Sequence, residues 1–324
     1  MGVPTARLFD AEGRDREVAA WAHAIASIEK HQLLWIDVDR DRAEDVLPEL
    51  ADTLGLDARE LVRVGKGSGK ARSTRTSDYL HLTIQAFEPS ADGSIPDAPT
   101  ELDIVAGNDV VVTVHRGQLP AIERYRAGLT GETRLGELRA ADLLSSIVDE
   151  VLGGYFLVVE EIDLAIDALD ARALRGTDDR EFLAEIVEIR RRIAATRRVV
   201  APHREAFATL ARPEMRVEER IGQPWPGLMD RLERALGAID TARDALLGTF
   251  DIFMGRAAQR NNDVMKILTI LSAILLPSVV RAGVMGMNFR LPLFEDTGNF
   301  AYVLAVMIGL AVGVVAVARL RRWI

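Results

Sequence analysis

The sequence predicts a mixed α/β domain, followed by a long α-helical stalk and a C-terminal hairpin of two transmembrane helices. The first observation behind this fold class is the charge distribution. The chain has 324 residues, of which 27% are charged, yet only four charged residues lie between Ile267 and Ala318. The other two are alternating strand and helix patterns over the first ~120 residues and a long helical seam after Trp225. We therefore expect a soluble front part and a membrane-embedded back part.

Short apolar runs and period-two alternation mark the strands of the front domain, residues 1–135. The predicted strands are Leu33–Val38, Tyr79–Ala86, Thr100–Ala106 and Val110–His115. The turn Gly107–Asp109 would join the last two as a pair. Between the first two strands, Ala43–Leu54 has helical spacing. Strands and helices mixed in this order indicate a small cytoplasmic α/β domain.

Long charged helices are expected in residues 136–225, where the strand patterns stop. One amphipathic helix is predicted over residues 140–172 and a second over residues 179–211, with a break around Gly176. Acidic residues are dense on the first helix and Arg is dense on the second. An antiparallel pair with surface salt bridges accounts for this composition, each bridge being worth about 0–1 kcal/mol.

A coiled-coil-like seam marks the stalk, residues 226–266. Its apolar residues recur at steps of 3, 4 and 7. They are Leu232, Leu236, Ile239, Leu246, Phe250 and Phe253. No strong helix breaker precedes Pro277, so we expect one continuous helix from Leu228 to Met285, about 87 Å long at helical rise.

Two apolar segments near the C-terminus are each long enough to cross a bilayer. Each has 19 residues, close to the ~20 that the hydrocarbon core requires. They are residues 267–285 and 300–318, joined by the loop 286–299 and followed by the basic tail 319–324. Cationic residues lie before the first segment and after the second, so the positive-inside rule places both ends in the cytoplasm and the loop outside. The predicted location is the inner cell membrane.

Composition excludes several functional classes. The formal net charge of −9 argues against a general nucleic-acid binder, and the absence of Cys excludes disulfide scaffolds and thiolate metal sites. The N-terminus lacks the apolar segment of a signal peptide. The loop Gly65–Lys70 departs from the phosphate-binding pattern because Ala71 follows its last Lys, and the five histidines form no close pair. We expect no enzyme.

One face of the first apolar segment carries small and polar residues at steps of 3 or 4, and we expect it to continue the stalk seam. The face consists of Asn262, Met265, Leu268, Ser272, Leu276, Val279 and Gly283. A surface that only contacts lipid would not require Ser or Gly. Such residues suit either a helix-packing face or the lining of a channel between several copies.

Two segments closely resemble the signature of the CorA family of divalent-cation transporters. They are Asn262–Thr269 (NDVMKILT) and Ala282–Phe289 (AGVMGMNF), with Pro277 between them. The triplet Gly286-Met287-Asn288 follows the first of two C-terminal spans, after a cytoplasmic α/β domain and long helices. Trp35–Asp37 and His115 also resemble the soluble domain of that family.

The resemblance implies a funnel-shaped homopentamer that carries Mg²⁺ into the cell, driven by the membrane potential. Five first spans would line the pore, and Gly286, Met287 and Asn288 would form the outer entrance. Asn288 would offer amide oxygens to a hydrated ion, and Mg²⁺ gives up its waters reluctantly. Met265 and Leu268 match an apolar constriction that closes by dewetting, with Asn262 as a polar ring below it. The implied partners are other copies of the chain, the lipid bilayer and divalent cations, with no organic cofactor and no nucleic acid.

Several positions differ from the pattern that the resemblance implies. Met285 replaces an aromatic residue, Arg290 stands where an acidic residue is frequent, Leu293 replaces a common Glu, and Val279 replaces a pore-facing Thr. The zinc-transporting branch typified by ZntB also varies around this motif. Transport of Zn²⁺, Co²⁺ or Ni²⁺ is therefore the alternative, and a membrane-anchored scaffold protein is the third possibility.

The start of the stalk helix differs as well. Many members carry an Asp there that helps to bind regulatory Mg²⁺ between subunits, and the corresponding position is Gly227. Asp230, three residues further on, is either a displaced ligand for this ion or an ordinary acid of the first helical turn. In the first span, Arg281 is expected to turn away from the pore and reach the outer interface.

Overall fold

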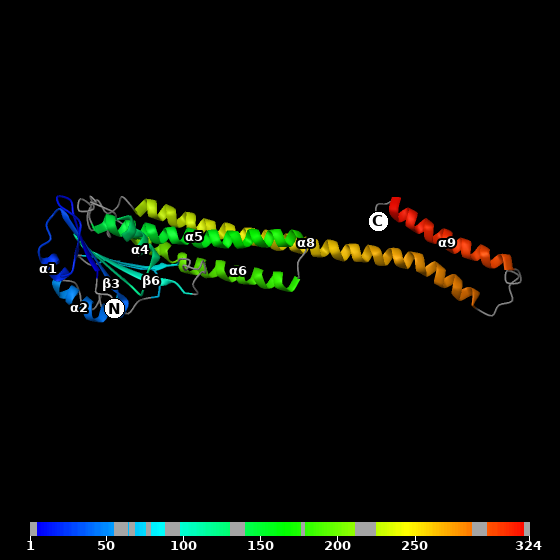
Figure 1. Ribbon diagram of the computed structural model, residues 1–324, viewed down its shortest axis with the longest axis horizontal. Coiled ribbons are helices and arrows are strands. Elements are labelled where there is room, and N and C mark those ends of the chain that lie inside the picture. Colours follow the sequence, from blue (N-terminus) through cyan, green and yellow to red (C-terminus); the bar gives the residue numbers. More distant parts are fainter. Residues whose placement is uncertain are drawn as a thin grey trace. The chain divides into compact units, whose positions relative to one another are not determined.

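The computed structural model describes residues 5–54, 64, 69–75, 79–87, 98–129, 140–175, 179–210, 225–286 and 297–320. The chain divides into two compact units, Met1–Thr249 and Phe250–Ile324. The boundary falls inside one helix, α8 (Trp225–Met285), and each unit is described by itself (Figure 1).

A seven-stranded mixed sheet forms the centre of the first unit, in the order β2-β1-β3-β7-β6-β5-β4. The strands are β1 (Thr5–Asp10), β2 (Arg16–Val18), β3 (Gln32–Asp39), β4 (Arg72–Arg75), β5 (Leu80–Ala86), β6 (Thr100–Ala106) and β7 (Val110–His115). All neighbours pair antiparallel except β3 and β7, which are parallel. The four predicted strands are confirmed, including the β6–β7 pair. The sequence analysis missed β1, β2 and β4.

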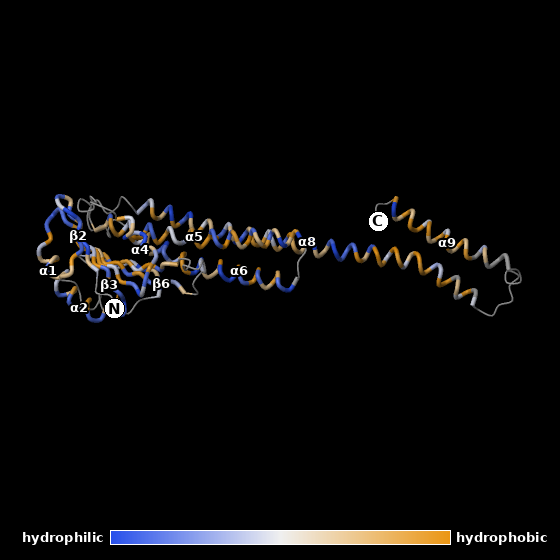
Figure 2. Tube along the Cα trace, viewed as in Figure 1, coloured by the Kyte–Doolittle hydropathy of each residue, from blue (hydrophilic) through white to orange (hydrophobic). Residues whose placement is uncertain are grey.

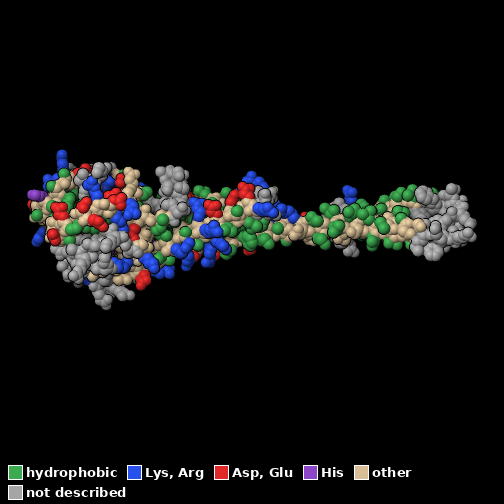
Figure 3. All heavy atoms as spheres, turned by 90° about the horizontal axis from the view of Figure 1, so that it is seen from below, with side chains coloured by type: hydrophobic (Ala, Val, Ile, Leu, Met, Phe, Trp, Pro, Cys, Tyr) green, Lys and Arg blue, Asp and Glu red, His purple; other side chains and the backbone are tan. Residues whose placement is uncertain are grey.

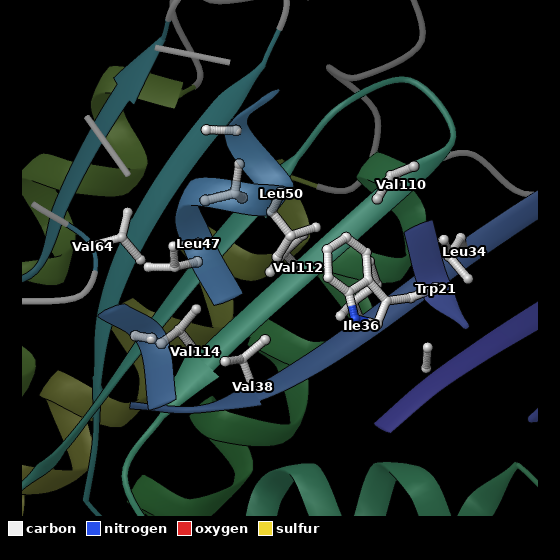
Figure 4. Close-up of a cluster of buried hydrophobic side chains, with 14 of the residues drawn as sticks. Trp21, Leu34, Ile36, Val38, Leu47, Leu50, Val64, Val110, Val112 and Val114 are labelled. Carbon is white, nitrogen blue, oxygen red and sulfur yellow. The ribbon is translucent and has the colours of Figure 1, made fainter. Parts of the chain in front are cut away.

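One face of the sheet packs against α1 (Trp21–Ala26) and α2 (Ala43–Leu54), with the short 3-10 helix Arg40–Arg42 before α2. Alternate residues of β3 and β7 point to this side, because side chains along a strand point to opposite faces. The cluster includes Leu34, Ile36, Val38, Leu47, Leu50, Val110, Val112 and Val114, and Figure 4 shows it with Trp21 at one end. The predicted helix Ala43–Leu54 has the bounds of α2.

The other face of the sheet is covered by α4 (Pro120–Gly128) and α5 (Ala140–Arg175). Trp35 donates its indole N–H to Thr113 Oγ1 at 3.0 Å, and Thr113 donates to Asp37 Oδ1 at 2.6 Å. Arg126 of α4 pairs with the other oxygen of Asp37 at 2.8 Å. His115 Nε2 lies 3.2 Å from Asp37 Oδ1, and His115 is buried. This network ties β3, β7 and α4 together.

The predicted second long helix is wrong in one respect. Residues 179–211 were expected to form a single helix, but the structure has α6 (Asp179–Val200) and α7 (His203–Leu210) with a turn between them. Pro202 lies at this turn. Proline lacks a backbone N–H and suits the start of a new helix, and α7 begins directly after Pro202.

His203, the first residue of α7, connects this helix to the sheet. Its Nε2 accepts the backbone N–H of Gln85 at 2.9 Å, and Tyr155 of α5 donates its hydroxyl to the carbonyl of Gln85 at 2.6 Å. Burial lowers the pKa of His203 to about 4. The ring is therefore neutral at physiological pH. Phe207 follows one turn later and packs on Trp225, the first residue of α8, with ring centroids 6.0 Å apart.

The stalk seam is buried inside its own chain. Leu232, Leu236, Ile239 and Leu246 are at most 4% exposed. Salt bridges attach the same part of α8 to the other helices: Arg231 to Asp149 of α5, Arg197 of α6 to Asp240, and Arg204 of α7 to Glu233. The seam therefore does not need other copies of the chain for its burial, because α5, α6 and α7 supply the partners.

The second unit contains the rest of α8 and the helix α9 (Thr297–Leu320). The predicted continuous helix is confirmed, and it begins three residues earlier, at Trp225. Within the described residues, α8 is long and apolar enough to cross a membrane, and its apolar stretch is not buried in the chain. The apolar part of α9 that the structure describes, Leu304–Leu320, is shorter. Figure 2 shows both stretches as hydrophobic.

Candidate functional site

The predicted pore residues all lie on α8 and form one stripe, which we call the ion stripe. Its members are Asn262, Met265, Leu268, Ser272, Leu276, Val279 and Gly283. An ideal helix turns about 100° per residue and rises 1.5 Å, so the ion stripe occupies an arc of about 120° and extends over about 31 Å. That length matches the hydrocarbon thickness of a bilayer.

Every member of the ion stripe is exposed in the single chain. Met265 is 58% and Leu268 54% exposed, which is unusual for large apolar side chains of a soluble protein. On an ideal helix Leu268 projects in the same direction as Phe250 of the stalk seam, because the 18 residues between them make about five full turns. That the ion stripe continues the stalk seam therefore stays a prediction. Burial changes along this helix, because Phe253 is the last buried seam residue and the ion stripe beyond it is exposed.

Two polar side chains of the ion stripe are free to form hydrogen bonds with water, an ion's hydration shell or another chain. Within the described part of the chain, neither the amide of Asn262 nor the hydroxyl of Ser272 has a hydrogen-bond partner, and both residues are exposed. Thr269 and Ser278 behave differently, because their hydroxyls donate to the carbonyls of Met265 and Ile274 at 2.7 and 3.2 Å. A hydroxyl satisfied by its own helix can face lipid at little cost. Asn262 and Ser272 thus differ from the other polar groups of the span.

The ion stripe carries no formal charge between Asn262 and Gly283. Asp263 follows Asn262 but lies on the other side of the helix, where its carboxylate accepts from Gln259 at 3.2 Å and pairs with Lys266 at 3.4 Å. The side chain of Arg281 lies outside the described part of the chain. Neutral dipoles can hold a hydrated dication without trapping it.

The outer entrance is described only at its first residue. Gly286 ends the helix, and its N–H donates to the carbonyl of Ala282 at 2.9 Å. A Cβ at this position would lie 3.3 Å from the same oxygen, so glycine allows the tight last turn. Met287, Asn288, Arg290 and the Leu291–Leu293 segment lie outside the described residues, and their roles remain predictions.

The ion stripe is also distinct from the surface of α8 that faces α9. A cavity of about 510 Å³ lies between the two helices and is lined on α8 by Thr269, Ile270 and Ala273. None of these three residues belongs to the ion stripe. The second helix of the same chain therefore leaves the ion stripe uncovered.

The ion stripe extends further toward the N-terminus than the sequence predicted. Continuing its steps of 3 and 4 back from Asn262 reaches Ala258, Met254 and Asp251, all exposed in the structure. Met254 is 48% exposed, whereas its neighbour Phe253 is buried. Asp251 is the first charged group on this face. The same steps of 3 and 4 in the sequence could have predicted that Asp251 lies on this face.

The predicted regulatory residues lie in the first turns of α8. Asp230 is exposed, and the structure gives its carboxylate no partner within the described residues. Gly227 is exposed too, and a Cβ built there would have nothing within 4 Å. An acidic side chain at Gly227 would therefore fit without steric conflict. Among the described residues, no group of three or more acidic or His side chains could hold a metal ion within one chain.

Comparison with known protein families shows to which family the chain belongs. The model of the family described as CorA-like Mg²⁺ transporter protein matches residues 30–322. The chain belongs to this family.

Individual CorA relatives extend the match over most of the chain. The cobalt/magnesium transport protein CorA of Thermotoga maritima is 29% identical over 299 residues, which cover 90% of this chain and 83% of that protein. The zinc transport protein ZntB of Yersinia enterocolitica is 24% identical, over 82% of this chain and 81% of ZntB. The complete structure of the CorA magnesium transporter from Methanocaldococcus jannaschii covers 100% of both chains with a TM-score of 0.76 at 21% identity. That structure supports the fold from the sheet to the C-terminal helices.

Proposed function

We propose that this CorA-family chain transports divalent metal cations, with Mg²⁺ as its main substrate, through a pore formed by several copies of α8. The observation that carries the proposal is the ion stripe. It is exposed, uncharged over a bilayer thickness, and presents the unpartnered Asn262 and Ser272. The Gly286-Met287-Asn288 triplet follows directly after it. A relative named as a cobalt/magnesium transporter supports the choice of substrate.

Several copies are required because two helices cannot enclose a path. The family resemblance suggests a homopentamer in which α8 lines the pore and α9 faces lipid. Five ion stripes would bury Met265 and Leu268 against one another at the axis. These apolar rings would form the gate, since a narrow apolar constriction closes by dewetting. Asn262 would form a polar ring on its cytoplasmic side.

The membrane potential would drive inward transport. Cationic flanks place both ends of the α8–α9 hairpin in the cytoplasm. Moving two positive charges inward is then favourable by roughly 4.6 kcal/mol per 100 mV. Asp251 would add a ring of carboxylates on the cytoplasmic side of the pore. Such a ring raises the local concentration of cations.

Ion flux into liposomes tests the proposal. Purified protein should give Mg²⁺-dependent dye signals, and Asn288→Ala should lower the initial flux by about tenfold or more, because a ring of amide oxygens is lost. Asn299→Ala, which removes an amide from the start of α9, is the control and should keep wild-type flux. Normal Mg²⁺ flux in Asn288→Ala would contradict the assigned entrance.

Zinc transport is the second candidate, supported by the similarity to ZntB and by Met285, Arg290 and Leu293 near the entrance. Flux measured in parallel with Mg²⁺, Zn²⁺, Co²⁺ and Ni²⁺, with and without a pH gradient, separates the two. A Zn²⁺ flux that exceeds Mg²⁺ flux and follows the pH gradient would favour the ZntB-like reading.

A further inference from the structure

The outer face of α5 carries an unbalanced row of carboxylates. Glu160, Asp163 and Asp167 follow one another at steps of 3 and 4, so they lie on one side of the helix. All three are exposed, and no cation within the described part of the chain pairs with them. Partial burial, and then repulsion from Asp167, raise the pKa of Asp163. This row lacks a positive partner.

The outer face of α6 carries the opposite charge. Arg190, Arg191 and Arg198 are exposed, and Figure 3, which views the molecule from the side of α6, shows Lys and Arg side chains gathered over this region. Arg198 donates to the carbonyl of Ala194 on its own helix at 3.2 Å. No carboxylate within the described residues pairs with Arg190 or Arg191. The acidic residues of α6 lie on another flank, where Glu185 pairs with Arg172 of α5.

Large apolar side chains accompany both charged rows. Leu157 and Leu164 of α5 are 42% and 63% exposed, and Leu183 and Val187 of α6 are 40% and 38% exposed. Exposed apolar residues rimmed by charges are typical of protein–protein contacts. Each face therefore combines exposed apolar side chains with a row of like charges, and a partner surface of opposite charge would complement it.

The two rows also match in height along the helix pair. Arg172 of α5 pairs with both Glu181 and Glu185 of α6, which sets the register of the antiparallel pair. Asp163 lies nine residues before Arg172 on α5. Because the two helices are antiparallel, the same distance along α6 leads from Glu181 and Glu185 to about residues 190–194, which therefore lie level with Asp163. The carboxylates of α5 thus lie at the height of the Arg residues of α6. Within one chain the two rows form no ion pair among the described residues.

We propose that in the assembled transporter the acidic face of α5 packs against the basic face of α6 of the next copy. The contact joins two different surfaces, so it is heterologous and closes into a ring when the rotation fits. Rotation about an axis parallel to the helices keeps every residue at its height, so the carboxylates of one chain meet the Arg residues of the next. This inference rests on the proposed homo-oligomer and adds the surface that holds it together.

Cross-linking between two differently tagged copies tests the contact. The chain has no Cys, so Leu164→Cys in one copy and Val187→Cys in the other provide single reactive thiols. Coexpressed copies treated with a short bis-maleimide should yield the mixed dimer. Each variant expressed alone should yield none, because a heterologous contact places only one thiol in each interface.

Charge reversal sharpens the test. Asp163→Arg in both copies should lower the yield of mixed dimer by about tenfold, because like charges then face each other. Adding Arg191→Asp should restore the yield. Glu205→Arg is the control, since Glu205 is exposed on α7, outside both faces, and it should leave the yield unchanged.

The outcomes distinguish this inference from the proposed function. An intact oligomer without the mixed cross-link, or with self cross-links in either single variant, would overturn the α5–α6 contact and leave the pore proposal standing. A monomer in lipid nanodiscs would overturn the homo-oligomer itself. Recovery of the cross-link by the Asp163→Arg, Arg191→Asp combination would support the contact.

Discussion

At the scale of single residues, the first apolar segment contains two kinds of polar side chain: those that form a hydrogen bond within their own helix and those that form none. Thr269 and Ser278 donate to carbonyls of their own helix. Asn262 and Ser272 have no such partner within the described residues. Burying a polar group without a hydrogen bond costs free energy, so the second pair indicates a face that meets water or hydrated ions. The proposed ion path depends on this difference.

Residues Met265 and Leu268 provide the test of the gate. Met265→Asp or Leu268→Asp should make the pore leakier, because carboxylates hydrate a constriction that apolar side chains keep dry. The measurement is Mg²⁺ flux into liposomes at high internal Mg²⁺, where the wild type should be closed. Val264→Asp, on an exposed side chain next to the ion stripe, is the control for the cost of a carboxylate at this depth. Closed behaviour in both gate variants would place the gate elsewhere.

Gly227 allows a test of cytoplasmic regulation. Gly227→Asp should strengthen inhibition by internal Mg²⁺, lowering the half-inhibiting concentration by about three- to tenfold, because carboxylates between subunits repel unless a cation bridges them. The new side chain has open space around it. Gly237→Asp is the matched control, since Gly237 also lies on α8 with nothing within 4 Å of a Cβ. Equal inhibition curves for Gly227→Asp and the wild type would argue against a sensor at this position.

At the scale of secondary-structure elements, α8 does two separate tasks along its 61 residues. Its first part is a buried helix of the soluble unit, held by α5, α6 and α7. Beyond Phe253 its described side chains are half-buried or exposed, and they include the ion stripe. Proline does not decide these boundaries alone. Pro277 remains inside α8, whereas Pro202 lies directly before α7.

The attachment of α7 to the sheet predicts a pH dependence of stability. The pKa of His203 is lowered from 6.5 to about 4 because the ring is buried, so the folded state binds fewer protons than the unfolded state between these values. Stability is therefore full above about pH 6.5 and falls by about 3 kcal/mol as pH falls to 4.

Thermal unfolding of the full-length protein in detergent, measured from pH 7 to pH 4, checks this expectation. His203→Gln keeps an acceptor for the N–H of Gln85 but does not titrate. It should lower stability at pH 7 and flatten the decline between pH 6.5 and 4. An equally steep decline in His203→Gln would assign the pH dependence to other groups.

At the scale of the whole molecule, the proposed pore predicts an assembly of several chains. The ion stripe leaves large apolar side chains uncovered, and α9 covers a different side of α8. The mass of the protein in lipid nanodiscs should correspond to five chains. Labelling should find residues 265 and 268 shielded from lipid-soluble probes. A monomer or dimer with both residues accessible to lipid would contradict the pore.

Local patterns in the sequence were sufficient for much of this protein. Period-two alternation predicted β5, β6 and β7, an apolar run predicted β3, and helical spacing predicted α2 and the length of α8. The charge-poor segments and the Gly286-Met287-Asn288 triplet indicated the family before any coordinates. These features could be read because each depends on residues close together in the chain.

Only the tertiary structure showed which faces of the helices and strands pack against one another. It added the strands β1, β2 and β4, which are stabilised by neighbours far away in sequence and carry weak patterns of their own. It placed the break before α7 where His203 can reach Gln85. It also showed that the seam of α8 is buried by its own chain as far as Phe253, while the ion stripe beyond it is exposed. Apolar spacing shows that a helix has a face to bury, but the partner that buries it depends on contacts between distant segments, which a one-dimensional pattern does not contain.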